Sequence, residues 1–336
     1  MFSRRLLLTV SLITLCVVSG LAQSTDREAY LSLFRHGEFE KAAALLKQIT
    51  KKEGSNADAW YHYGMALAQT GREKDSVKAF QKAIALKPTD DIYHAGLAQA
   101  YMLAGDKNME TAARKSLELS KDANPQAHWV LGVWALRSGD YKTAHDEAAR
   151  TLELQPNNVP ALALESQALV SLYIEQRNAV PRSASTSAAL LVQAADTLDK
   201  FVAMSQPGSV TDVYRQQAES IRFFADYYSD PNRRPVRPAD PAVAGDPAFT
   251  PVKIIEKRPA PYTPSARANY ISGTARLLVG FGPDGTVKHV IVTKPLDPGL
   301  DQNAVRAARE IKFEPAKRNG VPVPAVLTVE YNWQIR

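Results

Sequence analysis

The chain of 336 residues contains a single cysteine, Cys16. One cysteine can form neither an internal disulfide framework nor a cysteine-rich zinc site. The chain also lacks a run of 18 apolar residues, which excludes a protein with several membrane-spanning helices. Its six histidines are scattered, and no H-E-x-x-H zinc pattern, nucleophile elbow or Walker loop is present. The sequence therefore predicts a protein that is not an enzyme, with no catalytic residue, metal or cofactor.

The letters of the dinucleotide-binding pattern G-x-G-x-x-G occur at residues 280–285. Pro283, Asp284 and Gly285 predict a turn between two strands, and no helix follows that could place its N-terminus against a pyrophosphate. We therefore expect a hairpin turn at this position and no nucleotide site.

The N-terminus has the pattern of a secretory signal. Arg4 and Arg5 precede a largely apolar run from Leu6 to Val18, which is shorter than the roughly 20 residues that span a bilayer. Ala22 follows at an acceptable cleavage point. The sequence predicts a signal peptide at residues 1–22 and a protein of the periplasm or cell envelope. An uncleaved segment that anchors the chain in the inner membrane remains the alternative.

A period of 34 residues runs through the first two thirds of the chain, and its turn glycines recur at Gly37, Gly71, Gly105 and Gly139. The clearest unit spans residues 57–90, with landmarks at Trp60, Tyr63, Gly64, Leu67, Gly71, Phe80, Ala83 and Pro88. This pattern resembles the tetratricopeptide repeat (TPR), a helix-turn-helix unit of 34 residues. One departure is Ser76, which stands where the family usually has alanine.

The resemblance implies an all-α TPR solenoid over residues 23–228, with about five helix pairs. The last pair is stretched, and the segment 210–229 reads as a capping helix. Stacked repeats leave a concave groove, lined by their first helices, where such domains usually bind peptides. The groove candidates are Arg27, Tyr61, Met65, Gln69, Gln99, Trp129 and Arg137. Tyr61 and Trp129 could equally pack between repeats.

Proline and positive charge mark the boundary that follows the repeats. Residues 229–264 hold nine of the 21 prolines, which predicts a stiff, extended linker. Residues 229–336 carry 16 Lys and Arg against 10 Asp and Glu, whereas the two signs balance before residue 229. A basic C-terminal segment could bind acidic peptides or anionic surfaces of the cell envelope. Its positive charges could equally be ordinary surface charges in contact with water. Nucleic acid is not an expected partner of an exported protein.

The C-terminal segment, residues 265–336, predicts a small α+β domain of ββαβ order. Apolar and polar residues alternate over 273–281 and 287–294, which predicts two strands around the turn. A helix is expected near Leu300, and the same alternation over 324–335 predicts a third strand. The turn, the pair Leu300-Asp301 before the helix and the run KFEPA at 312–316 resemble the C-terminal domain of the TonB energy-transducer family.

That resemblance implies recognition of outer-membrane receptors or other peptides by strand addition to the edge of the last strand. The strand would run from Val323 to Gln334, with outward residues supplying selectivity. The candidate binding residues are Val323, Ala325, Leu327, Thr328, Val329, Glu330, Tyr331 and Asn332. A homodimer formed through this domain, or a cover within the chain, would occupy the same edge.

Two recognition domains without catalytic motifs favour a protein-protein interaction adaptor, or scaffold, of the cell envelope. One alternative is an energy-transducer component of TonB-dependent transmembrane transport, which requires an uncleaved N-terminal anchor. Another is a structural factor in envelope or cell-wall assembly.

Overall fold

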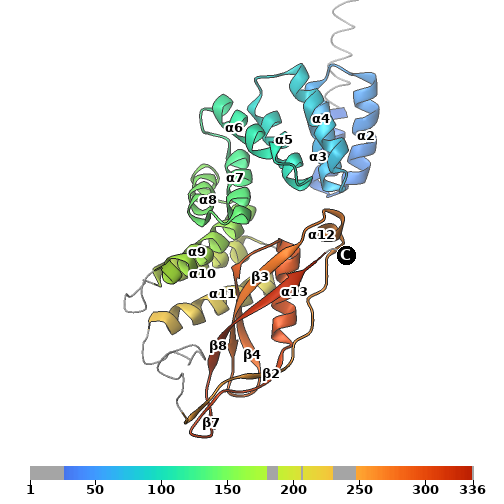
Figure 1. Ribbon diagram of the computed structural model, residues 1–336. Helices are drawn as coiled ribbons and strands as arrows, with labels where there is room; N and C mark the ends of the chain where they lie inside the picture. Colours follow the sequence, from blue (N-terminus) through green and yellow to red (C-terminus); the bar gives the residue numbers. More distant parts are fainter. Residues whose placement is uncertain (1–25, 180–187, 206, 230–246, 335–336) are drawn as a thin grey trace, which may run out of the picture. The chain divides into compact units, whose positions relative to one another are not determined.

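A computed structural model describes residues 26–179, 188–205, 207–229 and 247–334 (Figure 1). The predicted signal peptide and residues 230–246 of the predicted linker lie outside these ranges. No helix in the described part combines the length and apolar character needed to cross a membrane. The chain divides into two compact units, Met1–Val130 and Leu131–Arg336.

The N-terminal unit consists of antiparallel helix pairs, as the repeat predicts. From residue 39 to residue 120, each helix packs against its neighbours in the chain, and the helix at Ala57–Gln69 also contacts the helix at Asp91–Leu103, the first helix of the next pair. After a first helix at residues 26–35, the elements are α2 (Phe39–Lys52), α3 (Ala57–Gln69), α4 (Glu73–Leu86), α5 (Asp91–Leu103), α6 (Asn108–Ser120) and α7 (Pro125–Ser138), whose second half belongs to the C-terminal unit.

The 34-residue period has a physical basis in the start of each first helix. The side chains of Asn56 and Asn124, two periods apart, each accept a hydrogen bond of 3.0 Å from the backbone amide three residues later. Such N-caps satisfy a donor that the helix leaves open. Trp60, His94 and His128 recur at the same place in successive repeats, and a ring nitrogen of each lies 2.9–3.2 Å from the carbonyl oxygen six residues earlier. The two histidines therefore have structural positions.

The turn glycines have the backbone conformation that the repeat requires. Gly37, Gly71, Gly105 and Gly139 all have positive φ angles between 69° and 85°, a region that other residues rarely occupy. Phe80 of α4 lies between two further glycines, Gly64 and Gly96, of the flanking first helices. The absence of a side chain at these two positions lets the phenyl ring fill the space between neighbouring repeats.

The C-terminal unit continues with four more helices: α8 (Tyr141–Leu154), α9 (Val159–Ala179), α10 (Ala189–Met204) and α11 (Ser209–Ser229). α9 and α10 form the stretched fifth pair, and α11 packs along α10 where the capping helix is predicted. The solenoid of five pairs and a final helix is therefore confirmed.

A sheet with an attached helix completes this unit, in the predicted ββαβ order. The strands β3 (Gly273–Phe281), β4 (Val287–Lys294) and β8 (Ala325–Trp333) are antiparallel and lie in the order β4-β3-β8. Between β4 and β8 the chain forms α13 (Pro298–Arg309), which Asp297 caps by accepting the amides of Gly299 and Leu300. One face of the sheet forms a core with α13 that includes Leu277, Ala304 and Trp333.

The structure departs from the predicted linker, 229–264, at its C-terminal end. This segment contains two strands, β1 (Phe249–Thr250) and β2 (Lys253–Glu256), and the start of α12 (Pro264–Ala268). β1 and β2 pair with segments about 60 residues later in the chain, so their local sequence gives little sign of them. The partner strands are β5 (Lys312–Glu314) and β6 (Lys317–Arg318), and β7 (Val321–Pro322) pairs with β6.

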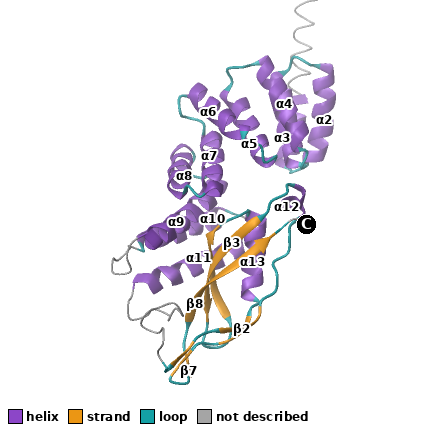
Figure 2. Ribbon diagram, in the orientation of Figure 1, coloured by secondary structure: helices purple, strands orange, loops and turns teal. Residues whose placement is uncertain are grey.

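The second face of the sheet is covered by the end of the helical array, so the sheet lies between two helical layers (Figure 2). Phe223 of α11 stacks on His289 of β4 with ring centroids 3.9 Å apart. The side chain of Gln167 in α9 donates to the carbonyl of Val292, 3.1 Å away. The sequence predicts modules held apart by a spacer. In the C-terminal unit, the last helices and the sheet instead share one core.

Candidate functional site

The outer edge of β8 is the first part of the candidate site. β8 pairs with β3 on one side only, and no strand among the described residues pairs with its other side. The carbonyl oxygen of Glu330 accepts a hydrogen bond of 2.8 Å from the ammonium group of Lys257. This carbonyl therefore faces the outer edge of β8. Because the amide and carbonyl of one residue point to the same side of an antiparallel strand, those of Val326, Thr328 and Asn332 also face outward.

The predicted edge-strand residues divide into two groups. Thr328, Glu330 and Asn332 are exposed, whereas Ala325, Val329 and Tyr331 are buried, and Leu327 is partly buried. The buried group fixes the strand on the α13 side of the sheet. In the exposed group, Glu330 pairs with Arg276 and Asn332 accepts a hydrogen bond from Thr274, both on β3. The predicted start of the strand, Val323, is wrong by two residues. Its amide bonds the carbonyl of Ala316, which removes it from β8.

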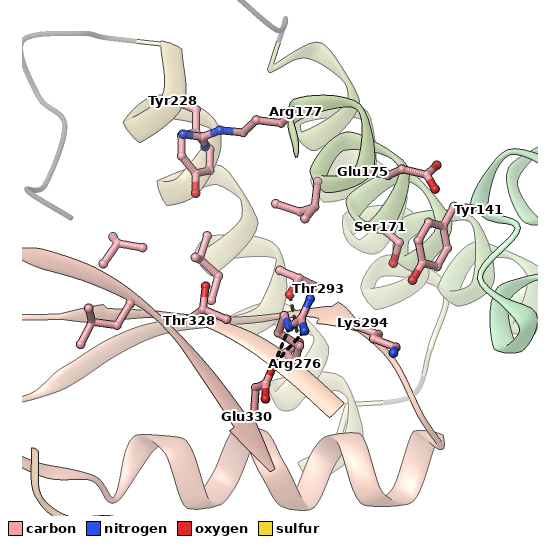
Figure 3. A pocket seen from close by; sticks show the side chains of 14 residues that line it. Tyr141, Ser171, Glu175, Arg177, Tyr228, Arg276, Thr293, Lys294, Thr328 and Glu330 are labelled. Carbon is pink, nitrogen blue, oxygen red and sulfur yellow. Dashed lines mark hydrogen bonds and ion pairs between the residues drawn. The ribbon is translucent and has the colours of Figure 1, made fainter. Parts of the chain in front are cut away.

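A cleft with a volume of about 740 Å³ lies over the second face of the sheet, beside β8 (Figure 3). α8, α9 and α11 contribute one wall, and all three strands contribute the floor. Its apolar lining consists of Ile174, Leu278, Val326 and Leu327. Its polar lining consists of Tyr141, Ser171, Glu175, Arg177, Tyr228, Arg276, Thr293, Lys294, Thr328 and Glu330.

The floor of the cleft is organised by a cross-strand ion pair. Arg276 and Glu330 face each other in the β3–β8 register, and their side chains approach to 2.8 Å. The Thr293 hydroxyl donates to the carbonyl of Arg276 at 3.0 Å, which ties β4 to the same place. Burial raises the pKa of the Tyr141 phenol at the helical wall, and the nearby carboxylate of Glu175 raises it further. Tyr141 therefore remains a neutral donor at neutral pH.

A cation stacked on an aromatic ring stands at the other end of the cleft. The guanidinium carbon of Arg177 lies 3.4 Å from the ring centroid of Tyr228, a cation–π contact between α9 and α11. One terminal nitrogen of Arg177, Nη1, is buried and has no hydrogen-bond acceptor among the residues that the structure describes. A guanidinium nitrogen can donate but not accept, so Nη1 lacks a partner within the described part of the chain.

The groove residues predicted on the repeats lie on first helices. Tyr61 is largely packed between repeats, with its ring 5.2 Å from that of Tyr93 and 5.6 Å from that of Phe80. Burial raises the pKa of Tyr61 to about 12. Gln99 is partly buried and accepts a hydrogen bond of 2.7 Å from Gln126 of the next repeat. These contacts agree with a packing role for Tyr61 and for Gln99.

The remaining groove candidates have different degrees of exposure. Arg27, Gln69 and Arg137 are exposed, and Met65 and Trp129 are partly buried. Tyr61, Met65 and Gln69 share one face of α3 at a spacing of four residues. Peptide binding by this face stays a prediction.

The sequence alone gave no reason to single out Arg177, Tyr228, Tyr141 or Lys294. Arg177, Tyr228 and Tyr141 come from three different helices and belong to no repeat landmark, and the strand pattern that includes Lys294 gives no sign that it meets these helices. Arg276 could have been found, because aligning the predicted strands places it opposite Glu330. Among the described residues, no group of three or more His, Cys, Asp or Glu is placed to hold a metal ion.

Two family models match the chain. Residues 258–335 match the Gram-negative bacterial TonB protein C-terminal, and residues 29–91 match the tetratricopeptide repeat. The chain carries a TPR array followed by a TonB-type C-terminal domain. Both families are non-catalytic interaction domains. The cleft therefore lies between the last helices of the TPR array and the sheet of the TonB-type domain.

Solved TPR proteins resemble the helical part at low sequence identity. PilW, a type IV pilus biogenesis factor, is 15% identical with a TM-score of 0.45, covering 62% of this chain and 90% of PilW. A TPR protein of Thermus thermophilus is 12% identical with a TM-score of 0.47, covering 60% and 98%. MamA of Desulfovibrio magneticus is 16% identical with a TM-score of 0.40, covering 54% and 93%. No curated protein matches the chain.

Proposed function

We propose that this protein is an adaptor of the cell envelope that binds one protein on the TPR array and a second by strand addition to β8. The TPR and TonB-type domains indicate protein-protein interaction, and the unpaired edge of β8 is the observation that carries the proposal. An added strand would bond the outward amides and carbonyls of Val326 and Thr328 and the amide of Glu330, whose carbonyl already accepts a hydrogen bond from Lys257. Backbone bonds supply affinity in this mode, and neighbouring side chains supply selectivity.

The edge is suited to this role because the strand behind it is firmly held. β8 has nine residues in continuous register with β3, from Ala325 opposite Phe281 to Trp333 opposite Gly273. The indole of Trp333 donates to the carbonyl of Ala260 at 3.0 Å, which fixes the far end of the strand. An edge strand that is already ordered before binding loses little conformational entropy when a partner strand adds to it.

The test uses the full mature chain and extended peptides selected from a displayed library of random peptides. Thr328→Pro removes the outward amide and places the proline ring toward an incoming strand, whereas the bonds to β3 come from neighbouring residues. We expect it to weaken peptide binding by about tenfold or more, because one backbone bond contributes about 1 kcal/mol and the ring adds a clash. Fluorescence anisotropy measures the affinity.

Thr328→Ala is the matched control, because it removes the same side chain and keeps the amide. Equal binding by the proline and alanine variants, with both still folded by circular dichroism, would contradict strand addition. A concentration-dependent dimer in sedimentation that only Thr328→Pro dissolves would instead assign the edge to a second copy of this chain.

A second candidate, favoured by the TonB-type match, is an energy-transducer component of TonB-dependent transport. It requires residues 1–22 to remain attached as an inner-membrane anchor. N-terminal sequencing and membrane fractionation of the protein from its native host separate the two candidates. A soluble chain that begins at Gln23 supports the adaptor, and a membrane-bound chain that retains residues 1–22 supports the transducer.

A further inference from the structure

The cleft beside β8 belongs to neither domain alone. Its floor comes from the TonB-type sheet, and its wall comes from the last helices of the TPR array. Thr328 and Glu330 have outward-facing backbone groups and also line the cleft (Figure 3). A peptide strand bonded to these groups would therefore place alternate side chains at the mouth of the cleft. The volume of about 740 Å³ falls in the usual range of binding clefts.

The charges that line the cleft are unequally compensated. Arg276 and Glu330 pair with each other at 2.8 Å. Within the described residues, Arg177 and Lys294 form no ion pair, so two cations remain. The carboxylate of Glu175 points toward Tyr141, whereas Arg177, two residues later on α9, extends toward Tyr228 (Figure 3). Near Tyr228 the described residues that line the cleft therefore present the positive charge of Arg177 without a paired acid.

Arg177 is held in a position suited to bind an anion. Its guanidinium stacks on Tyr228, which restricts the side chain, and Nη1 is buried with no acceptor from the described segments. A buried donor that lacks a partner costs free energy, and the cost is larger when the group is charged. A carboxylate satisfies such a planar guanidinium with two parallel hydrogen bonds.

We infer that the cleft binds an acidic side chain, Asp or Glu, of the peptide segment that adds to β8, with Arg177 bonding its carboxylate. This inference rests on the strand addition proposed above and names the chemistry of the partner. Leu278 and Val326 are buried in the core beneath the cleft, and the partly buried Ile174 beside them offers a surface for an aliphatic neighbour of that acid. The partner's recognition segment is therefore extended, with an acid beside apolar residues.

The same displayed library tests the inference with the full mature chain. We expect the selected peptides to share an Asp or Glu at one fixed position. Replacing that residue by its amide should weaken binding to the wild-type protein by about tenfold or more, because a charge-assisted bond is lost. In the Arg177→Gln variant the acid and amide peptides should bind equally. This comparison is a double-mutant cycle that isolates the contact.

Two further variants keep the result interpretable. Arg114→Gln removes an exposed arginine of α6 that pairs with Glu110, and it should leave the preference for the acid unchanged. Arg177→Lys keeps the charge, so it should retain part of the preference even if Arg177→Gln disturbs the packing on Tyr228.

The outcomes separate the two proposals. Peptides that bind through β8 by the Thr328 test, but show no preference for an acid or keep it in Arg177→Gln, would overturn the acidic partner and leave strand addition intact. Failure of the Thr328 test, or failure to select any peptide, would overturn both.

Discussion

The two units of this protein build their cores in different ways. In the N-terminal unit, helices meet through small residues, as where Phe80 lies between Gly64 and Gly96. In the C-terminal unit, α9–α11 bury the large side chains of Tyr173, Ile221 and Phe224 in a core that also includes Leu278 and Ile291 of the sheet. The first design repeats along the chain and can be extended by one pair at a time. The second joins the array to one specific domain.

The largest effect is expected from Phe224→Ala, because Phe224 is fully buried in the shared core. Such a truncation costs about 3–5 kcal/mol of unfolding free energy. If helices and sheet unfold together, amide exchange should rise in both α11 and β4. Denaturant unfolding and hydrogen exchange measure the two effects.

Phe80→Ala is the matched truncation in the N-terminal unit, where Phe80 is 2% exposed. It should destabilise by a similar amount but raise exchange in α3–α5 only, because repeats contact mainly their neighbours. Faster exchange in α11 with unchanged exchange in β4 after Phe224→Ala would show that the core is not shared.

The second largest effect is a dependence of folding stability on pH that arises at Asp301, in the C-terminal unit. Burial, assisted by the charge of Asp297, raises the pKa of Asp301 from 3.8 to about 7. The folded state therefore holds the proton more tightly, and the stability that this provides is complete below about pH 4 and lost as the pH rises to about 7. The change is at most about 4 kcal/mol.

Asp301→Asn keeps an acceptor for the amide of Leu296, which Asp301 bonds at 3.0 Å, and cannot ionise. Thermal melts between about pH 4 and pH 7.5 should therefore show a smaller fall in stability for the variant than for the wild type. Parallel pH profiles would remove Asp301 as the cause. His289, whose pKa burial lowers, contributes the opposite slope near its own pKa in both proteins.

The sequence predicts the first design better than the second, for a physical reason. Turn glycines such as Gly71 and the N-cap Asn56 act on their own helices, so the 34-residue period reveals them. β8 can be predicted because apolar and polar residues alternate along its sequence. The cleft is not visible, because contacts such as Gln167 to Val292 join residues 125 apart without any repeating pattern.

A smaller loss of stability is expected at Gly96, where the ring of Phe80 leaves no room for a side chain. A Cβ added at Gly96 would lie 2.9 Å from two ring carbons of Phe80, which is closer than packed atoms approach. Overpacking costs about 1–3 kcal/mol, and the higher helix propensity of alanine returns up to about 1 kcal/mol. Gly96→Ala should therefore lower the stability of the N-terminal unit by about 1–2 kcal/mol in denaturant unfolding.

Gly54→Ala is its control, because the nearest atom to an added Cβ is the carbonyl oxygen of Thr50 at 3.8 Å. Combining Gly96→Ala with Phe80→Leu should cost less than the sum of the two changes, since the smaller side chain relieves the clash. Additive losses would mean that Phe80 is not the group that limits the space.

The smallest effect concerns Ser76, which replaces the alanine usual in the repeat. Its hydroxyl is fully buried and donates to the carbonyl of Gly64 at 2.8 Å, linking the two helices of one pair. Ser76→Ala should therefore cost about 1 kcal/mol, the net contribution of such a bond. Two periods later, Ala144 occupies the corresponding place, where its methyl side chain has no hydroxyl to donate. If Ser76→Ala leaves the unfolding midpoint unchanged, packing alone holds the pair together, as it does at Ala144.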